Sequence, residues 1–305
     1  MGTPDFAVPS LRALIEIGAP IRLVITQPDR PSGRGRKISR SPVKILAEDL
    51  EIPLYQPQRV RGDEVIDKIR SYQVECAIVV AFGQIVPQQF LDLFPKGTLN
   101  VHASLLPKYR GAAPIQRSIL MGETLTGISI MQLDAGMDTG PVLSQREVPI
   151  YPEDSFGALH DRMAREGASL LLETLSDWTA GRIAPRSQDG TRATYAPPVK
   201  KEELRIHWNL PAKDIINRIR AFDPAPGAYF VHGGKRVKCF RAVHFPWTGS
   251  GGPGEVAGTS DSGIIVTGGD GQALAVGELQ MEGQRRIRAN EFICGRSVPA
   301  GCFLE

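Results

Sequence analysis

Long hydrophobic runs and closely spaced cysteines are both scarce in this 305-residue sequence. No apolar run approaches the roughly 18 residues that a membrane-spanning helix needs, so we expect no membrane partner. No basic stretch followed by an apolar one opens the chain, and a secretion signal is therefore not expected. The four cysteines, Cys76, Cys239, Cys294 and Cys302, form no CxxC pair. A disulfide framework or a metal site is therefore not expected, and a cytoplasmic location fits.

A strong net charge is also missing, since 36 Lys and Arg against 33 Asp and Glu leave only +3. Composition therefore does not indicate a nucleic-acid binder, and only clustering of charge can. No GxSxG nucleophile elbow and no GxxxxGK[ST] phosphate loop are present. The composition that remains, 42% hydrophobic and 23% charged, is that of a globular protein. At roughly 150 residues per domain, about two domains are expected.

The first half of the chain alternates strand-like and helix-like segments. A long amphipathic helix is predicted over residues 155–178, from the spacing of its leucines. Strands alternating with helices predict βαβ units and an open parallel sheet, here over residues 1–181. The strand-like segments are residues 21–26, 74–82, 99–104 and 126–133.

The pattern changes after residue 181. Residues 182–202 are polar, contain prolines and have no period, which predicts a linker. From residue 203 to residue 305, short strand-like pieces separated by Gly and Pro turns predict a small β-barrel or sandwich. The start of the chain is unusual, because GTPDF (Gly2–Phe6) is typical of the turn after the first strand of an α/β domain, and no strand precedes it.

The stretch LNVHASLLPKYRG carries polar residues on a predicted strand. Asn100 and His102 are two residues apart, so their side chains project from the same face. Both lie near the carboxyl end of the strand, where open α/β sheets bind ligands. They are therefore candidate catalytic residues, although His102 could also be a hydrogen-bonded, partly buried histidine with no catalytic role.

A carboxylate follows the next predicted strand. Asp138 lies in LDAGMDTGPVL between Gly136 and Gly140, which permit a tight turn. The loop after that strand would bring Asp138 over the same edge of the sheet as His102. Asp134 is a rival for this position, and either aspartate could simply form an Asx-turn.

Asn, His and Asp together form an acid–base set that lacks a nucleophile. Such a set suits direct transfer of an acyl group between two nitrogens, because the incoming amine must lose a proton and the leaving nitrogen must gain one. A histidine can do both, and an aspartate can orient it or tune its charge. The NH₂ group of an asparagine can donate to the oxyanion of the tetrahedral intermediate.

The strongest cluster of charge lies between residues 29 and 44. It is too polar to pack and too long for an ordinary loop of an α/β unit. It is either a solvated loop or an arm that becomes ordered on a polyanion, with arginines pairing to phosphates. Its basic residues are Arg30, Arg34, Arg36, Lys37, Arg40 and Lys44.

These motifs make the sequence resemble the methionyl-tRNA formyltransferases over essentially the whole chain. The segments that carry the resemblance are GTPDF, TQPDRPSGRGRK, SPVK, LNVHASLLPKYRGAAPIQRSI, TGISIMQLDAGMDTGPVL and RAFDPAPGAY. NVHASLLP and MDTG also mark the wider family of 10-formyltetrahydrofolate-dependent formyltransferases. The GRGRK loop and the attached C-terminal domain point to the members that act on tRNA.

The resemblance implies a Rossmann-like domain, which binds the folate donor, followed by an OB-like domain, which binds tRNA. The implied reaction moves the formyl group of 10-formyltetrahydrofolate to the α-amino group of initiator Met-tRNA, in a monomer without a metal. Asn100, His102 and Asp138 match the catalytic residues of the family. The implied folate loop is Ser104, Leu105, Leu106 and Pro107. The implied tRNA-binding residues are Arg34, Arg36, Lys37, Lys200 and Lys201.

The one departure is the absence of the first strand that such proteins have before GTPDF, and we expect the biological protein to begin a few residues upstream.

Other members of the family are the first alternatives: a glycinamide ribonucleotide formyltransferase, a 10-formyltetrahydrofolate hydrolase or a sugar-nucleotide formyltransferase. The first would end near the first domain, and the other two need no cationic arm. An RNA-binding protein with a decayed active site is the alternative from another class. The intact Asn100, His102 and Asp138 argue against it.

Overall fold

The computed structural model describes residues 1–32, 37–294 and 299–305. It divides the chain into two compact units that alternate along the sequence. The predicted linker is split between them after Ala196. The first unit consists of residues 1–114, 126–148 and 160–196, and the second of residues 115–125, 149–159 and 197–305.

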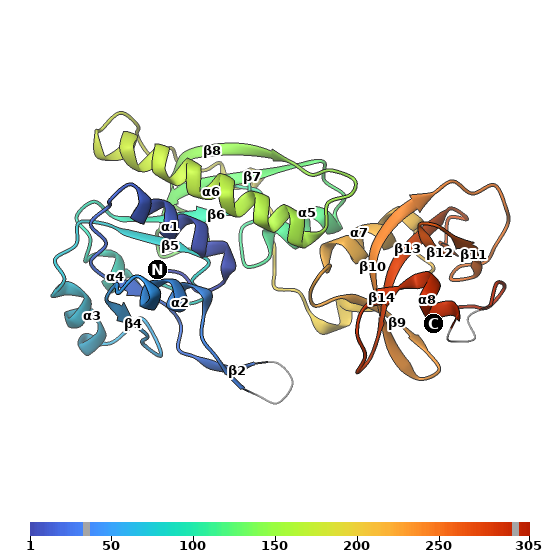
Figure 1. The fold of residues 1–305 in the computed structure, drawn as a ribbon. Coiled ribbons are helices and arrows are strands. Elements are labelled where there is room, and N and C mark those ends of the chain that lie inside the picture. The colour runs from blue at the N-terminus through green and yellow to red at the C-terminus, as the bar shows by residue number, and fades with distance from the viewer. Residues whose placement is uncertain (33–36, 295–298) are drawn as a thin grey trace. The chain divides into compact units, whose positions relative to one another are not determined.

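A four-stranded sheet is the centre of the first unit (Figure 1). Its strands, in spatial order, are β5 (Ala77–Val80), β6 (Thr98–His102), β7 (Leu125–Gln132) and β8 (Val142–Pro149). Two smaller pairs are β1 (Val24–Ile25) with β4 (Leu54–Tyr55), and β2 (Arg30–Ser32) with β3 (Lys37–Ser39). The helices that begin in this unit or cross into it are η1 (Asp5–Ala7), α1 (Val8–Glu16), α2 (Pro42–Asp49), α3 (Asp63–Arg70), α4 (Gln88–Leu91), α5 (Pro114–Leu120), α6 (Phe156–Thr179) and η2 (Gly190–Arg192).

The four-stranded sheet is mixed, so the prediction of a purely parallel sheet is wrong. Strand β6 pairs in parallel with β5 but antiparallel with β7, and His102 lies opposite Ser129. A parallel crossover needs a helix that packs back across the sheet. The helix between β6 and β7 is α5, and nearly all of it belongs to the second unit. The chain therefore enters β7 from the end at which β6 finishes.

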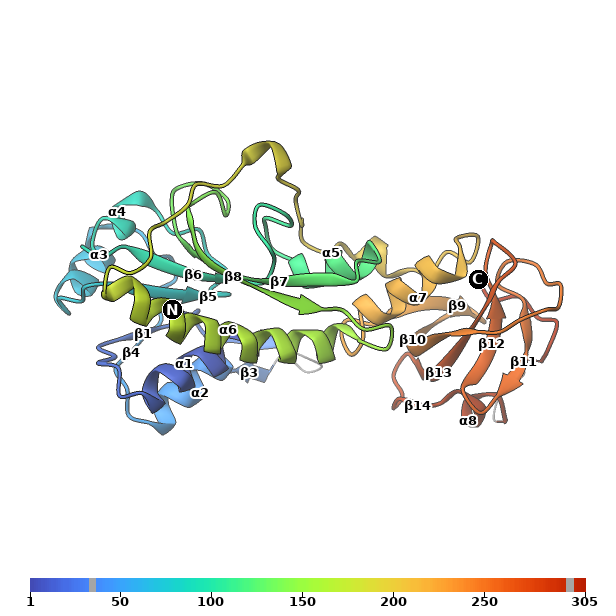
Figure 2. The ribbon, with the colours of Figure 1, turned by 90° about the horizontal axis from the view of Figure 1, so that it is seen from above.

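Helix α6 confirms the predicted long amphipathic helix and runs along one face of the sheet (Figure 2). Its side chains Met163 and Leu171 are fully buried. Gly167 lets the helix approach β6 closely, because a Cβ at this position would lie 3.0 Å from Cγ1 of Val101. The helix thus supports the strand that carries Asn100 and His102 from behind.

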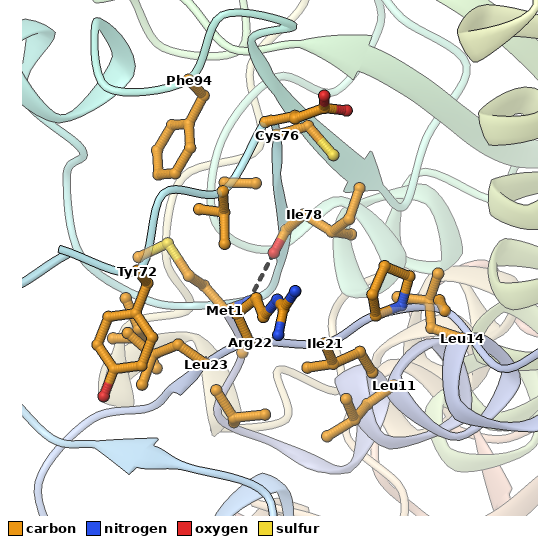
Figure 3. A pocket seen from close by; sticks show the side chains of 18 of the residues that line it. Met1, Leu11, Leu14, Ile21, Arg22, Leu23, Tyr72, Cys76, Ile78 and Phe94 are labelled. Atoms are coloured by element: carbon orange, nitrogen blue, oxygen red, sulfur yellow. Dashed lines mark hydrogen bonds between the residues drawn. The ribbon is translucent and has the colours of Figure 1, made fainter. Parts of the chain in front are cut away.

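The first two residues bridge β1 and β5. The Met1 amine donates to the Ile78 carbonyl at 2.6 Å, and the Gly2 amide donates to the Ile25 carbonyl at 3.1 Å. An apolar cavity of about 500 Å³ lies beside Met1 and is lined by residues of both strands. Figure 3 shows side chains that line it. Burial in these apolar surroundings lowers the pKa of the Met1 amine to about 5.

The second unit contains an antiparallel sheet in which the strands follow the order β11-β12-β13-β10-β9, with β14 beside β13. Its strands are β9 (Ala228–His232), β10 (Lys235–Phe245), β11 (Val256–Ser260), β12 (Gly263–Thr267), β13 (Ala273–Met281) and β14 (Ile287–Arg288). Its further helices are η3 (Lys201–Leu204), α7 (Ala212–Ala221) and α8 (Ala289–Cys294). Over the described residues, none of the helices has the length and apolar character needed to span a membrane.

A separate C-terminal β domain is thus confirmed, but no pair between β9 and β11 closes the described strands into a barrel. The last residues lie between these two edges instead. The Val256 amide donates to the Cys302 carbonyl at 2.8 Å, and the Val231 amide donates to the Glu305 carbonyl at 2.7 Å. The OB-like form of this domain stays a prediction.

An ion pair within the second unit fixes the start of its C-terminal part. Both carboxylate oxygens of Glu203 accept hydrogen bonds from the Arg117 guanidinium, and Oε1 also accepts from the Lys200 amide at 2.8 Å. The Arg117 hydrogen bonds lower the pKa of Glu203 from 4.5 to about 2. A carboxylate with a lowered pKa stabilises the folded state above its ordinary pKa, and this contribution is lost as the pH falls toward 2.

Replacing Glu203 by Gln is therefore expected to lower the free energy of unfolding at pH 7 by about 1–2 kcal/mol. This value is smaller than the free energy that the full pKa shift would correspond to, because the Glu203 side chain keeps 30% of its surface exposed and solvent screens the ion pair. Urea titrations of the wild type and the variant should show a difference that shrinks between pH 4.5 and pH 2. Glu202→Gln, on the exposed neighbour, is the control. A pH-independent difference would contradict the role of the ion pair.

Candidate active site

Strand β6 presents two polar side chains in the interior of the first unit. Asn100 keeps 8% of its surface exposed and His102 keeps 6%. Because they are two residues apart, both project from one face of the strand. The side-chain amide of Asn100 makes no hydrogen bond with the residues that the structure describes, although Asn100 is buried. An unpaired amide on a rigid central strand is therefore available to a ligand.

His102 lies between two oxygen atoms. Its Nε2 is 3.1 Å from the Tyr109 carbonyl oxygen, and its Nδ1 is 3.6 Å from Oδ2 of Asp138. A carbonyl oxygen only accepts, so Nε2 carries the proton of that hydrogen bond. The Tyr109 carbonyl thus fixes one side of the ring, and the other side faces the carboxylate.

Asp138, rather than its rival Asp134, is the aspartate that reaches His102. Oδ2 of Asp138 accepts from the Gly111 amide at 2.8 Å, while Oδ1 has no partner among the described residues. Asp134 instead accepts from the Gly136 amide and the Thr139 hydroxyl, as in an Asx-turn. The two roles that the sequence left open are divided between the two aspartates.

The route by which Asp138 reaches the site differs from the prediction. Because β7 is antiparallel, its carboxyl end lies beside the start of β6, and the Leu133 amide donates to the Thr98 carbonyl. The loop 133–141 must then return along β6 by about 13 Å, the length of four extended residues. The stretch from Leu133 to Asp138 is long enough for that return, because its five residue steps can span about 16 Å. The predicted proximity is correct, although the reason given for it is not.

The predicted folate loop follows β6 directly. Ser104 and Leu106 are buried, and Leu105 and Pro107 are half-buried. Two polar side chains hold the loop: the Ser129 hydroxyl bridges the Ser104 carbonyl and the Leu106 amide, and the Gln145 amide donates to the Leu106 carbonyl. Ser104 and Leu106 thus shape the loop from inside, whereas Leu105 and Pro107 remain accessible.

A segment that the sequence marked only as linker packs against this site. The Arg110 amide donates to the Thr194 carbonyl at 2.9 Å, and the Ala196 amide donates back to the Arg110 carbonyl at 2.7 Å. Figure 2 shows the segment on the face of the sheet opposite α6. Gln188, in the same segment, bonds to both Arg110 and Asp138. Aperiodic polar sequence gave no signal for these contacts.

The structure describes only some of the predicted tRNA-binding residues. Arg34 and Arg36 lie outside the described residues, and Lys37 begins β3. Lys200 and Lys201 belong to the second unit and are exposed around the start of η3. Within the part of the chain that the structure describes, no three His, Cys, Asp or Glu side chains are grouped as metal ligands.

The arrangement contains an imidazole that can move a proton, a carboxylate beside it and a neutral amide that can donate to an oxyanion. The nearby hydroxyls of Ser104 and Ser129 are committed to backbone carbonyls, so neither is free to act as a nucleophile. These groups suit direct transfer between an acyl donor and an acceptor bound at the same time.

Comparison with known proteins agrees with this chemistry. Residues 1–175 match the formyl transferase family, and residues 198–297 match the formyl transferase C-terminal domain. A methionyl-tRNA formyltransferase of Geobacter metallireducens is 46% identical over 305 residues, which cover 100% of this chain and 95% of that protein. One of Syntrophus aciditrophicus is 43% identical over 304 residues, which cover 100% and 97%.

A solved structure shows the same fold at low sequence identity. The N-formyltransferase from Helicobacter canadensis, in complex with folinic acid and dTDP-3-aminofucose, covers 90% of this chain and 96% of its own, with a TM-score of 0.67 and 18% identity. Both parts of the chain thus match the same kind of enzyme, and the full-length relatives agree. The chain therefore belongs to the formyl transferase family, in the group of the methionyl-tRNA formyltransferases.

Proposed function

We infer that this protein is an enzyme that transfers a formyl group from a folate to the α-amino group of methionyl-tRNA. The contact between His102 and Asp138 beside the unpaired amide of Asn100 is the observation that carries this proposal. The full-length similarity to methionyl-tRNA formyltransferases supports it. We propose 10-formyltetrahydrofolate as the donor and the initiator Met-tRNA as the acceptor, for the initiation of translation.

In the proposed reaction the amine nitrogen attacks the formyl carbon, and the carbonyl oxygen becomes an oxyanion. The Asn100 amide would donate to that oxyanion. The attacking nitrogen loses one proton, N10 of the folate gains one, and the bond between N10 and the formyl carbon breaks. His102 would carry the proton between the two nitrogens, with Asp138 facing its Nδ1. The products are formylmethionyl-tRNA and tetrahydrofolate.

The loop 104–107 is the proposed folate-binding segment. Leu105 and Pro107 are its accessible side chains, and the Ser129 and Gln145 hydrogen bonds hold its backbone in place. A rigid loop beside the catalytic face suits a donor whose reacting carbon must be placed accurately. The folinic acid bound by the Helicobacter canadensis enzyme, which shares the fold, supports a folate as the donor.

The tRNA is the proposed macromolecular partner. The arginine-rich stretch with Arg34, Arg36 and Lys37, and the exposed Lys200 and Lys201, supply cations for phosphate contacts. We propose that the second unit, OB-like in form, holds the tRNA. We also propose that the enzyme is a monomer in the cytoplasm. Sedimentation analysis tests the assembly state.

An acceptor assay tests the proposed function. The enzyme is incubated with 10-formyltetrahydrofolate and either initiator Met-tRNA, elongator Met-tRNA or no acceptor. We expect rapid formylation of the initiator tRNA, slower formylation of the elongator and almost no release of formate without an acceptor. Release of formate that does not depend on tRNA would identify a hydrolase. Binding of tRNA without loss of the donor would identify an inactive RNA-binding protein.

A further inference from the structure

Gln188 uses the whole hydrogen-bonding capacity of its side-chain amide. Its Oε1 accepts from Nε and Nη2 of Arg110, at 3.1 and 2.7 Å. Its Nε2 donates to the carbonyl oxygens of Asp138 and Gly140, at 2.8 and 2.7 Å. From Pro185 to Gly190, Gln188 is the one residue that is half-buried, and its neighbours are exposed. Four hydrogen bonds from one side chain indicate a structural role for Gln188 in holding these groups together, unlike that of an ordinary surface side chain.

The two segments that Gln188 joins both touch His102. One segment carries the Tyr109 carbonyl, which accepts from Nε2 of His102, and the other carries the Asp138 carboxylate. The Gly111 amide, which donates to Oδ2 of Asp138, links the same two segments a second time. Gln188 therefore closes a ring of contacts around the imidazole without touching it.

The backbone that Gln188 holds is an unusual one. Asp138 has a φ of +54°, a left-handed conformation that side-chain-bearing residues adopt only when their surroundings support it. Gly140 lies so close to β7 that a Cβ there would be 1.9 Å from the Gln132 carbonyl oxygen. The amide of Gln188 binds the carbonyl oxygens at both ends of this strained turn.

The other partner of Gln188 is a buried cation. The Arg110 side chain is buried, with 6% of the residue exposed, and forms no ion pair with a carboxylate of the described residues. A guanidinium only donates and the two carbonyls only accept, so the orientation of the amide between them is determined. A glutamate in this position would suit Arg110 but would repel the carbonyl oxygens of Asp138 and Gly140.

We propose that Gln188 is a positioning residue of the active site, which holds the Asp138 turn so that its carboxylate faces His102. The assignment of a reaction step to Asp138 rests on the proposed function, but the positioning itself does not. The segment before Ala196 is then part of the catalytic apparatus rather than a tether between two domains.

Three variants test the proposal. Gln188→Met removes all four hydrogen bonds at similar size, Gln188→Glu keeps only those with Arg110, and Gln88→Met removes an exposed side-chain amide of the first unit that donates to Asp92. We expect kcat to fall at least tenfold in both Gln188 variants, with KM for the formyl donor changed less than threefold, and Gln88→Met to match the wild type. Wild-type kcat in Gln188→Glu would overturn the proposal, even if Gln188→Met fails to fold.

Two further readouts separate positioning from general destabilisation. Gln188→Met should slow an Asp138→Asn enzyme less than twofold, because it acts through a carboxylate already lost, and multiplicative losses would overturn the proposal. Hydrogen exchange at the Gly111 amide, which donates to Asp138, should accelerate in both Gln188 variants. Unchanged exchange would overturn the proposal whether or not the wild type formylates tRNA. Accelerated exchange with an inactive wild type would leave the positioning intact and reject the proposed function.

Discussion

Replacing His102 by Ala is expected to lower the rate of formyl transfer by about 10²–10⁴, because the transfer of protons between two nitrogens loses its carrier. His102 is buried on the central strand, between the Tyr109 carbonyl and the Asp138 carboxylate. Among the described residues, no second imidazole contacts His102 or Asp138. Single-turnover formylation with saturating folate and Met-tRNA measures the chemical step directly.

The affinity for Met-tRNA should remain nearly unchanged in this variant, because His102 is buried and is not one of the cations proposed to contact phosphates. His160→Ala, on helix α6 of the first unit where the ring bonds Asp161, is the matched control and should behave as the wild type does. An unchanged single-turnover rate in His102→Ala would remove His102 from the mechanism. A loss of tRNA affinity equal to the loss of rate would instead indicate a binding role.

Replacing Asp138 by Asn is expected to lower kcat by about 100-fold, within the range of general acid–base effects. The amide oxygen of the new side chain can still accept from the Gly111 amide, so the loop should keep its conformation. What is lost is the negative charge 3.6 Å from Nδ1 of His102. Steady-state kinetics should therefore show a lower kcat with little change in KM for either substrate.

Asp134→Asn is the matched control, because this aspartate belongs to the same loop and bonds Thr139 instead of facing His102. It should retain most of the activity. Equal losses in the two variants would show that the loop as a whole matters and not the charge beside His102. A nearly normal kcat in Asp138→Asn would assign Asp138 to orientation alone, without a charge-dependent or proton-carrying role.

Hydrophobic periodicity in the sequence correctly predicted the helix and the strand whose buried faces it determines. The leucine spacing located α6, and the two-residue period of β6 placed Asn100 and His102 on one face. The direction of β7 was not predictable in this way, because it depends on α5 belonging to the second unit rather than crossing the sheet. The predicted proximity of Asp138 to His102 is correct only because the loop after β7 is long enough to return along β6.

The contacts of Gln188 could not be predicted from the sequence. They join three segments separated by 48 and 78 residues, and the segment around Gln188 has no helical or strand period. The pairing of Met1 and Gly2 with both β1 and β5 is long-range in the same way. Periodicity indicates which face of a helix or strand is buried. It carries no information about which distant polar side chain forms hydrogen bonds with the backbone of a loop.

The hydrogen bonds that join Arg110 to Thr194 and Ala196 also bear on how the enzyme is made. The first unit cannot be completed on the ribosome until residue 196 has emerged, although His102 and Asp138 are synthesised long before. Residues 115–125 and 149–159 belong to the second unit, so their packing cannot be completed until the β domain that follows has been synthesised. The nascent chain therefore holds two unfinished cores at once, and we expect it to gain catalytic competence late in synthesis rather than domain by domain.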